Sequence, residues 1–167
     1  RGIGISYYTG DTSGNRNSST EISGDGNLTL IGLHGAYSYE NWQIRGQYLF
    51  GTLDDSQAIT NANKTTPGLK PGNFSQLGSE AESAFVELAY NSQALFNVDN
   101  PLYLYSTYEY ANPMKKVAQG NATDRFNKQS IAFGVNYFPI KNFVLKAQVA
   151  QQMYAQSNLD DSNSFSL

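Results

Sequence analysis

The sequence SIAFGVNYFPIKNFVLKAQVAQQ, residues 130–152, decides the fold of this chain. Apolar side chains alternate with small or polar ones on both sides of a short segment, PIKN, at 139–142. Successive side chains of an extended backbone point to opposite sides, so an alternation of period two predicts a strand with two different faces. We therefore predict two long strands joined by a tight turn, with one apolar, aromatic face and one small, polar and sometimes charged face.

The composition excludes several classes of protein. The chain has 167 residues and no Cys, which excludes a disulfide framework, a catalytic thiol and a Cys-ligated metal site. The formal net charge is −3 without a basic run, so no nucleic-acid partner is predicted. Charged residues make up 15%, against about 25% in typical soluble domains. Few charges with many aromatic residues are expected where half of each strand is apolar.

The rest of the chain repeats the two-faced pattern. Further strands are predicted at 2–9, 27–39, 42–53, 83–91 and 101–111, although 83–91 would also fit a helix. The connectors 10–26, 54–82 and 112–124 are long, polar and predicted to be irregular, whereas 39–42 and 92–100 are short. Alternate connectors of a meander lie at the same end, so one rim carries tight turns and the other carries large loops. Bacterial outer-membrane barrels show this asymmetry.

The predicted fold is all-β, an antiparallel up-and-down transmembrane β-barrel of which this chain supplies about eight strands. An apolar run of about 18 residues, which a transmembrane helix needs, is absent. Both ends of the sequence look like strand interiors, RGIGISYY at 1–8 and SFSL at 164–167. We therefore predict that 1–167 is a partial barrel domain cut within strands at both ends.

Strand parity assigns the two faces. Arg or Lys facing lipid near the bilayer midplane costs about 2–4 kcal/mol, and charges within the predicted strands lie opposite the aromatic parity. The residues predicted to line a water-filled pore are Gln43, Arg45, Gln47, Glu87, Glu109, Asn136, Lys146, Gln148 and Gln152. The residues predicted to face outer-membrane lipid are Ile31, Leu33, Trp42, Ile44, Tyr48, Val86, Leu88, Leu104, Ile131, Phe133, Val135, Phe143, Leu145 and Val149. Arg45 and Glu87 are expected to form an ion pair in the wall or, alternatively, to set the field at a constriction.

Several segments resemble the phosphate-selective porin O/P family. They are NYFPIKNFVLK at 136–146, WQIRGQYLFG at 42–51, FVELAY at 85–90 and LYSTYEY at 104–110. The resemblance implies the later part of a sixteen-stranded, trimeric porin in the outer membrane of a Gram-negative bacterium. Family members often carry Arg where this chain has Thr107, and predicted pore-facing cations are few, so the permeant solute or ion stays open.

The predicted function is passive diffusion of small hydrophilic solutes or ions, without a cofactor. Two alternatives stay open: a non-conducting outer-membrane barrel that acts through its long loops, and a soluble β-barrel that binds an apolar ligand inside. No enzyme is predicted, because His34, the single imidazole, has Gly32 and Ala36 beside it and no nucleophile or paired carboxylate. No metal site is predicted, because the acidic loop 10–26 has Arg16 and Ile22 where an EF-hand needs Gly and Glu.

Overall fold

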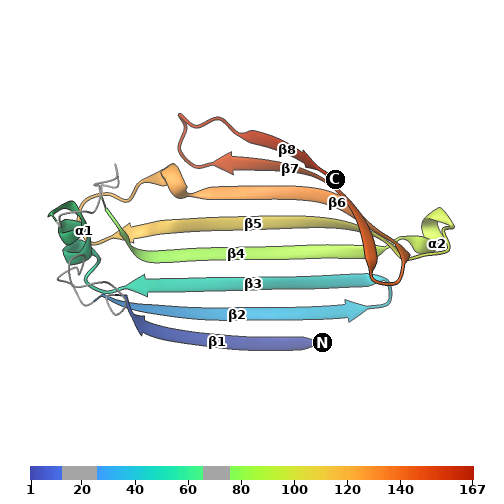
Figure 1. The fold of residues 1–167 in the computed structure, drawn as a ribbon, viewed down its shortest axis with the longest axis horizontal. Helices are drawn as coiled ribbons and strands as arrows, with labels where there is room; N and C mark the ends of the chain where they lie inside the picture. The colour runs from blue at the N-terminus through green and yellow to red at the C-terminus, as the bar shows by residue number, and fades with distance from the viewer. Residues whose placement is uncertain (13–25, 66–75) are drawn as a thin grey trace.

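The computed structural model describes residues 1–12, 26–65 and 76–167, and its main feature is a single antiparallel sheet (Figure 1). Eight strands follow one another across the sheet in chain order. They are β1 (Gly2–Asp11), β2 (Asn27–Tyr39), β3 (Trp42–Leu53), β4 (Gly78–Asn91), β5 (Leu102–Val117), β6 (Lys128–Ile140), β7 (Phe143–Tyr154) and β8 (Ser162–Ser166). The connectors hold α1 (Ser56–Thr65), α2 (Gln93–Phe96) and the 3₁₀ helix η1 (Asp124–Phe126). Within these ranges, no helix has the length and apolar character needed to cross a membrane.

The hairpin of β6 and β7 confirms the prediction for 130–152. Its turn is shorter than the PIKN segment, because β6 continues to Ile140 and β7 begins at Phe143. The ladder shifts register between Tyr137 and Ile140, around Pro139. Proline has no N–H to donate to a ladder, so an irregularity at this position is expected. Asn142 closes the turn with a φ of 69°, a conformation that Asn adopts more readily than most residues.

The predicted strand boundaries are right around the first short turn and wrong at the long-loop end. Strands β2 and β3 have the predicted bounds, and the segment 83–91 is a strand. However, β4 begins at 78 instead of 83, β5 continues to 117 instead of 111, and β1 continues to 11 instead of 9. Strand β8 begins at 162 instead of 164. The extensions are polar and lack the period-two alternation on which the prediction depends.

Two short helices occupy connectors for which irregular backbone is predicted. The stretch 54–82 contains α1 and the beginning of β4, and the connector 92–100 contains α2. Ile59 and Ala62 of α1 are buried against Leu53 and Leu77. The Thr60 hydroxyl donates to the carbonyl of Ser56 at 2.7 Å and accepts from the backbone N–H of Leu77 at 3.0 Å. These contacts hold α1 at the end of the strands, beyond the sheet (Figure 1). Residues 13–25 and 66–75, which include most of the predicted loop 10–26, lie outside the described residues.

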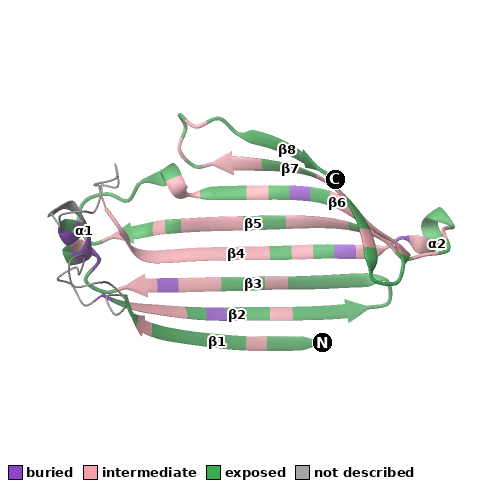
Figure 2. Cartoon of the chain, in the orientation of Figure 1, coloured by how far each residue is buried: buried purple, intermediate pink, exposed green. Residues whose placement is uncertain are grey.

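The sheet has little buried core of its own. In the described ranges the buried hydrophobic residues are Ile59, Ala62, Ala89 and Ala132. Figure 2 shows that exposed and half-buried residues occupy most of every strand. Most of the apolar surface of the strands therefore has no partner within the sheet, and a stable fold requires something to cover it.

The sheet is curved but not closed. Strands β1 and β8 form its two edges and do not pair with each other. The structure therefore confirms an eight-stranded antiparallel meander, and the closed barrel stays a prediction. Unpaired edge strands present free N–H and C=O groups, which favour pairing with further strands.

Candidate functional site: the polar face of the sheet

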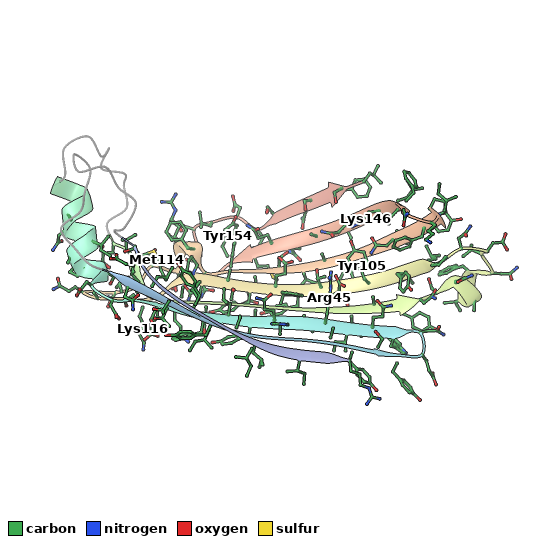
Figure 3. The ribbon with its side chains drawn as sticks, turned by 60° about the horizontal axis from the view of Figure 1, so that its bottom comes forward. Arg45, Tyr105, Met114, Lys116, Lys146 and Tyr154 are labelled. Atoms are coloured by element: carbon green, nitrogen blue, oxygen red, sulfur yellow. The ribbon has the colours of Figure 1, made fainter. Side chains whose placement is uncertain are left out.

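All nine residues predicted to line a pore lie on one face of the sheet, which we call the polar face. Directly opposite residues of paired strands share a face, and Arg45 is opposite Glu87. Farther along the sheet, Asn136 is opposite Lys146. One row of opposite residues crosses five strands and contains Gln47, Phe85, Glu109, Ser130 and Gln152. A second row contains Gln43, Ala89, Tyr105, Gly134 and Gln148. Figure 3 shows the sheet curving towards the side on which the labelled Arg45, Tyr105 and Lys146 lie.

The predicted ion pair between β3 and β4 is present. Arg45 donates from Nε to Oε1 of Glu87 at 2.7 Å and from Nη2 to Oε2 at 2.9 Å. The side chains are 63% and 21% exposed, so the pair lies at the surface of the polar face. An exposed pair contributes only about 0–1 kcal/mol to stability. Its consequence is mainly electrostatic, because two charges that neutralise each other add little to the net field of the face.

Tyr105 contributes a contact that strand parity does not predict. Its hydroxyl donates to Oε1 of Gln148 at 2.9 Å, so its side chain extends from β5 across β6 to β7. Gly134 lies beneath it on β6, and a Cβ added there would lie 2.4 Å from Cζ of the Tyr105 ring. The hydrogen bond therefore depends on a glycine at 134. Alternation places Tyr105 on the polar face, but only the register shows which residue it crosses.

A hollow of about 330 Å³ lies on the polar face towards the long-loop end. The residues of the polar face that line it are Gln47, Ser83, Phe85, Glu109, Ala111, Lys128, Ser130 and Gln152. Glu109 and Lys128 form no ion pair with each other or with any other described residue, unlike Arg45 and Glu87. The amide nitrogen of Gln152 donates to the hydroxyl of Tyr154.

Some residues that line the hollow are predicted from the sequence to line a pore, and others are not. Gln47, Glu109 and Gln152 are predicted pore-lining residues. The polar-face residues of the hollow without such a prediction are Ser83, Phe85, Ala111, Lys128 and Ser130. Ser130 and Lys128 have the same strand parity as Ala132, and this parity could have placed both on the polar face. Lys128, however, precedes the predicted strand. To predict that these side chains surround one hollow, the pairing register of five strands must be known.

Asn136 is half-buried within the sheet. Its Oδ1 atom has almost no exposed surface and no hydrogen-bond partner among the described residues. Lys146, opposite it, is exposed. Of this pair, the lysine therefore contributes more to the chemistry of the polar face.

The opposite surface, which we call the apolar face, carries all fourteen residues predicted to face lipid. Thirteen of them are exposed, from 37% for Ile131 to 60% for Phe133, and Val135 is half-buried. Trp42 and Tyr90 are in contact at the short-turn end, with ring centroids 4.7 Å apart. A continuous exposed apolar surface therefore runs across the sheet.

The charges of the predicted strands lie on the polar face, but the extensions of β4 and β5 at the long-loop end carry charges on the apolar side. Glu82 lies on the apolar parity, just beyond the apolar residues, and accepts hydrogen bonds from Tyr48 at 3.0 Å and Tyr110 at 2.9 Å. The ammonium of Lys115 is 2.6 Å from Oε2 of Glu82. Glu80 and Lys116 form a similar pair at 2.7 Å. Each charge on this border therefore has a partner of opposite sign.

Neither acid–base catalysis nor metal binding has an evident centre in the described part of the chain. His34 lies opposite Gly4 and Gln47, which supply neither a nucleophile nor a carboxylate. No three His, Asp or Glu side chains of the described ranges gather as metal ligands. The chemistry of the polar face is that of hydrogen bonding and charge.

Comparison with known proteins gives one distant relative. No family model matches the chain, and no solved structure matches it. A protein of Aquifex aeolicus (strain VF5), described as an uncharacterized protein, is 24% identical over 143 residues. The alignment covers 81% of this chain and 31% of that protein, so the chain spans about a third of the length of the relative it matches.

Proposed function

We propose that this chain forms part of the wall of a porin, a water-filled channel in the outer membrane of a Gram-negative bacterium. Small hydrophilic solutes or ions would diffuse through it passively. The observation that carries the proposal is the sheet with an exposed apolar face on its outer side and a polar face on its inner side. A membrane barrel needs this distribution, because lipid covers the outside and water fills the inside.

The dimensions of the strands support a membrane-spanning role. Strands β1 to β7 contain 10 to 16 residues each. A tilted strand needs about 9 to 11 residues to cross the hydrocarbon core, whereas globular strands average about 5 to 6. The two-residue turns at 40–41 and 141–142 lie at one end, and the long connector with α1 lies at the other (Figure 1). This arrangement fits short periplasmic turns and long external loops.

The curvature favours a channel over the soluble alternative. A soluble barrel that bound an apolar ligand would need its apolar face on the inner side. Here the inner side carries Arg45, Tyr105 and Lys146 (Figure 3). The unpaired edges of β1 and β8 provide places where further strands of a larger barrel would add.

The charges of the polar face support a channel with weak ion preference. Arg45 and Glu87 neutralise each other, which leaves Lys128 and Lys146 against Glu109 in the described part of this face. Strong anion selectivity needs rings or ladders of cations. We therefore propose passage of small hydrophilic solutes and ions of both signs, without a preference for phosphate. The trimer implied by the family resemblance stays a prediction.

The test uses the full-length protein that carries this chain. We expect it to require detergent for solubility, and to form stable channels that pass both K⁺ and Cl⁻ in a planar lipid bilayer. A protein that stays soluble and monomeric without detergent would contradict the membrane proposal. A protein that requires detergent but gives no conductance would favour the non-conducting barrel.

A further inference from the structure

We propose that the hollow on the polar face is a binding site for a small zwitterionic solute, an amino acid or a short peptide. This inference rests on the proposed function, because it identifies a solute class that the channel would contact. The hollow lies on the row of opposite residues that runs from Gln47 to Gln152. Its volume of about 330 Å³ falls at the small end of the range of ligand-binding clefts, about 300–1,000 Å³.

The first argument is the arrangement of charge. Glu109 on β5 is directly opposite Ser130 on β6, and Lys128 lies two residues before Ser130 on the same face. Diagonal neighbours of this kind have Cα atoms about 7–8 Å apart, which long side chains can bridge. Glu109 and Lys128 nevertheless form no ion pair with each other. A solute with both an ammonium and a carboxylate satisfies the two charges at once, with its ammonium at Glu109 and its carboxylate at Lys128.

The contrast with Arg45 and Glu87 makes this arrangement informative. Those two residues are directly opposite and use their charges on each other through two hydrogen bonds. The same face therefore contains one pair of opposite charges that is already satisfied and one that is open. Only the open pair borders the hollow.

The other lining residues suit a small polar solute with an apolar part. Phe85 is half-buried and presents a ring against which a side chain can pack. Gln47, Ser130 and Gln152 supply further hydrogen-bonding groups. A neutral sugar would leave both charges unpaired. A simple anion would gain the contact with Lys128 but would be repelled by Glu109. Of these three classes, the zwitterion alone pairs with both charges of the hollow.

The experiment measures block of the ion current by glutamine in bilayers that contain the full-length protein. We expect glutamine to reduce the current and glucose to have no comparable effect. Glu109→Gln and Lys128→Gln should each raise the half-blocking concentration of glutamine roughly tenfold, the size expected for losing a hydrogen bond to a charged group. Lys146→Gln is the matched control, because it removes one positive charge from the same face outside the hollow. It should leave the half-blocking concentration within about twofold.

A charge swap separates binding from structural damage. Glu109→Lys and Lys128→Glu should each abolish block by glutamine, whereas the double variant should restore it, because a zwitterion can bind in the reverse direction. Equal block by glutamine and glucose, or wild-type block in both single variants, would overturn the site and leave the channel proposal standing. Equilibrium dialysis of labelled glutamine against the detergent-solubilised protein makes the same comparison without a current. Dialysis therefore tests the binding site even if the protein forms no conducting channel.

Discussion

At the scale of single residues, Gly134 controls the packing of the polar face. A Cβ at this position would lie 2.4 Å from Cζ of the Tyr105 ring, well inside contact distance. We expect Gly134→Ala to displace the ring, break its hydrogen bond to Gln148 and lower the free energy of unfolding by about 1–3 kcal/mol. Urea unfolding of the full-length protein in lipid vesicles would measure this loss.

Two matched variants make the cause specific. Tyr105→Phe removes only the hydroxyl and should cost about 0.5–1.5 kcal/mol. A double-mutant cycle then compares Gly134→Ala and Tyr105→Ala with the variant that carries both substitutions. The clash is absent from the double variant, so its destabilisation should be smaller than the sum of the Gly134→Ala and Tyr105→Ala effects. Strict additivity would show that Gly134 and Tyr105 do not interact.

The ion pair of Arg45 and Glu87 leads to a second prediction at this scale. Each residue neutralises the other, so removing one partner uncovers the charge of the remaining residue. In the proposed channel, Arg45→Ala should shift the reversal potential in a KCl gradient towards cation preference, and Glu87→Ala should shift it towards anion preference. The double variant should resemble the wild type. Unchanged reversal potentials in both single variants would limit the pair to a structural role in the wall.

At the scale of secondary-structure elements, the sequence predicts strands well and the connectors poorly. Side chains alternate with period two where the two faces of a strand have different environments. This pattern predicts the bounds of β2 and β3 correctly. The first residues of β4 and the last residues of β5 lack alternation, because ion pairs such as Glu80–Lys116 replace apolar contacts there. The helix α1 offers only a few apolar positions, and its burial depends on Leu53 and Leu77 from outside the helix. A pattern within the connector does not reveal that contact.

The outward face of β4 provides the prediction for a membrane-spanning strand. Val86, near the middle of the apolar stretch of β4, is 42% exposed on the apolar face, whereas Thr107 lies opposite Glu87 on the polar face. If lipid covers the apolar face, Val86→Arg should destabilise the folded protein in vesicles by about 2–4 kcal/mol. Thr107→Arg adds the same charge beside a carboxylate and should be tolerated much better. Equal yields of both variants in a vesicle-folding assay would contradict the assignment of the faces.

At the scale of the whole molecule, the two faces are predictable and the hollow is not. Parity assigns Glu109 and Gln152 to the polar side without knowledge of neighbouring strands. Their convergence with Phe85 and Lys128 requires the register of β3 to β7, which the sequence does not encode in one local segment. Closure of the sheet is likewise a property of strands taken together. It depends on what pairs with the edges of β1 and β8.

Residues 1–167 contain no Cys, so thiols engineered into this segment make those edges testable by cross-links. Ser38→Cys with Gln43→Cys is a positive control, because these positions are directly opposite on β2 and β3 and a disulfide needs Cα atoms about 4.4–6.8 Å apart. Ser6→Cys with Ser164→Cys places one thiol on each edge strand. In the full-length protein we expect the control to cross-link under mild oxidation and the edge pair to stay reduced, because further strands would separate β1 from β8. Efficient cross-linking of the edge pair within one molecule would instead show a closed barrel of eight strands, whose narrow interior would leave little room for the proposed channel.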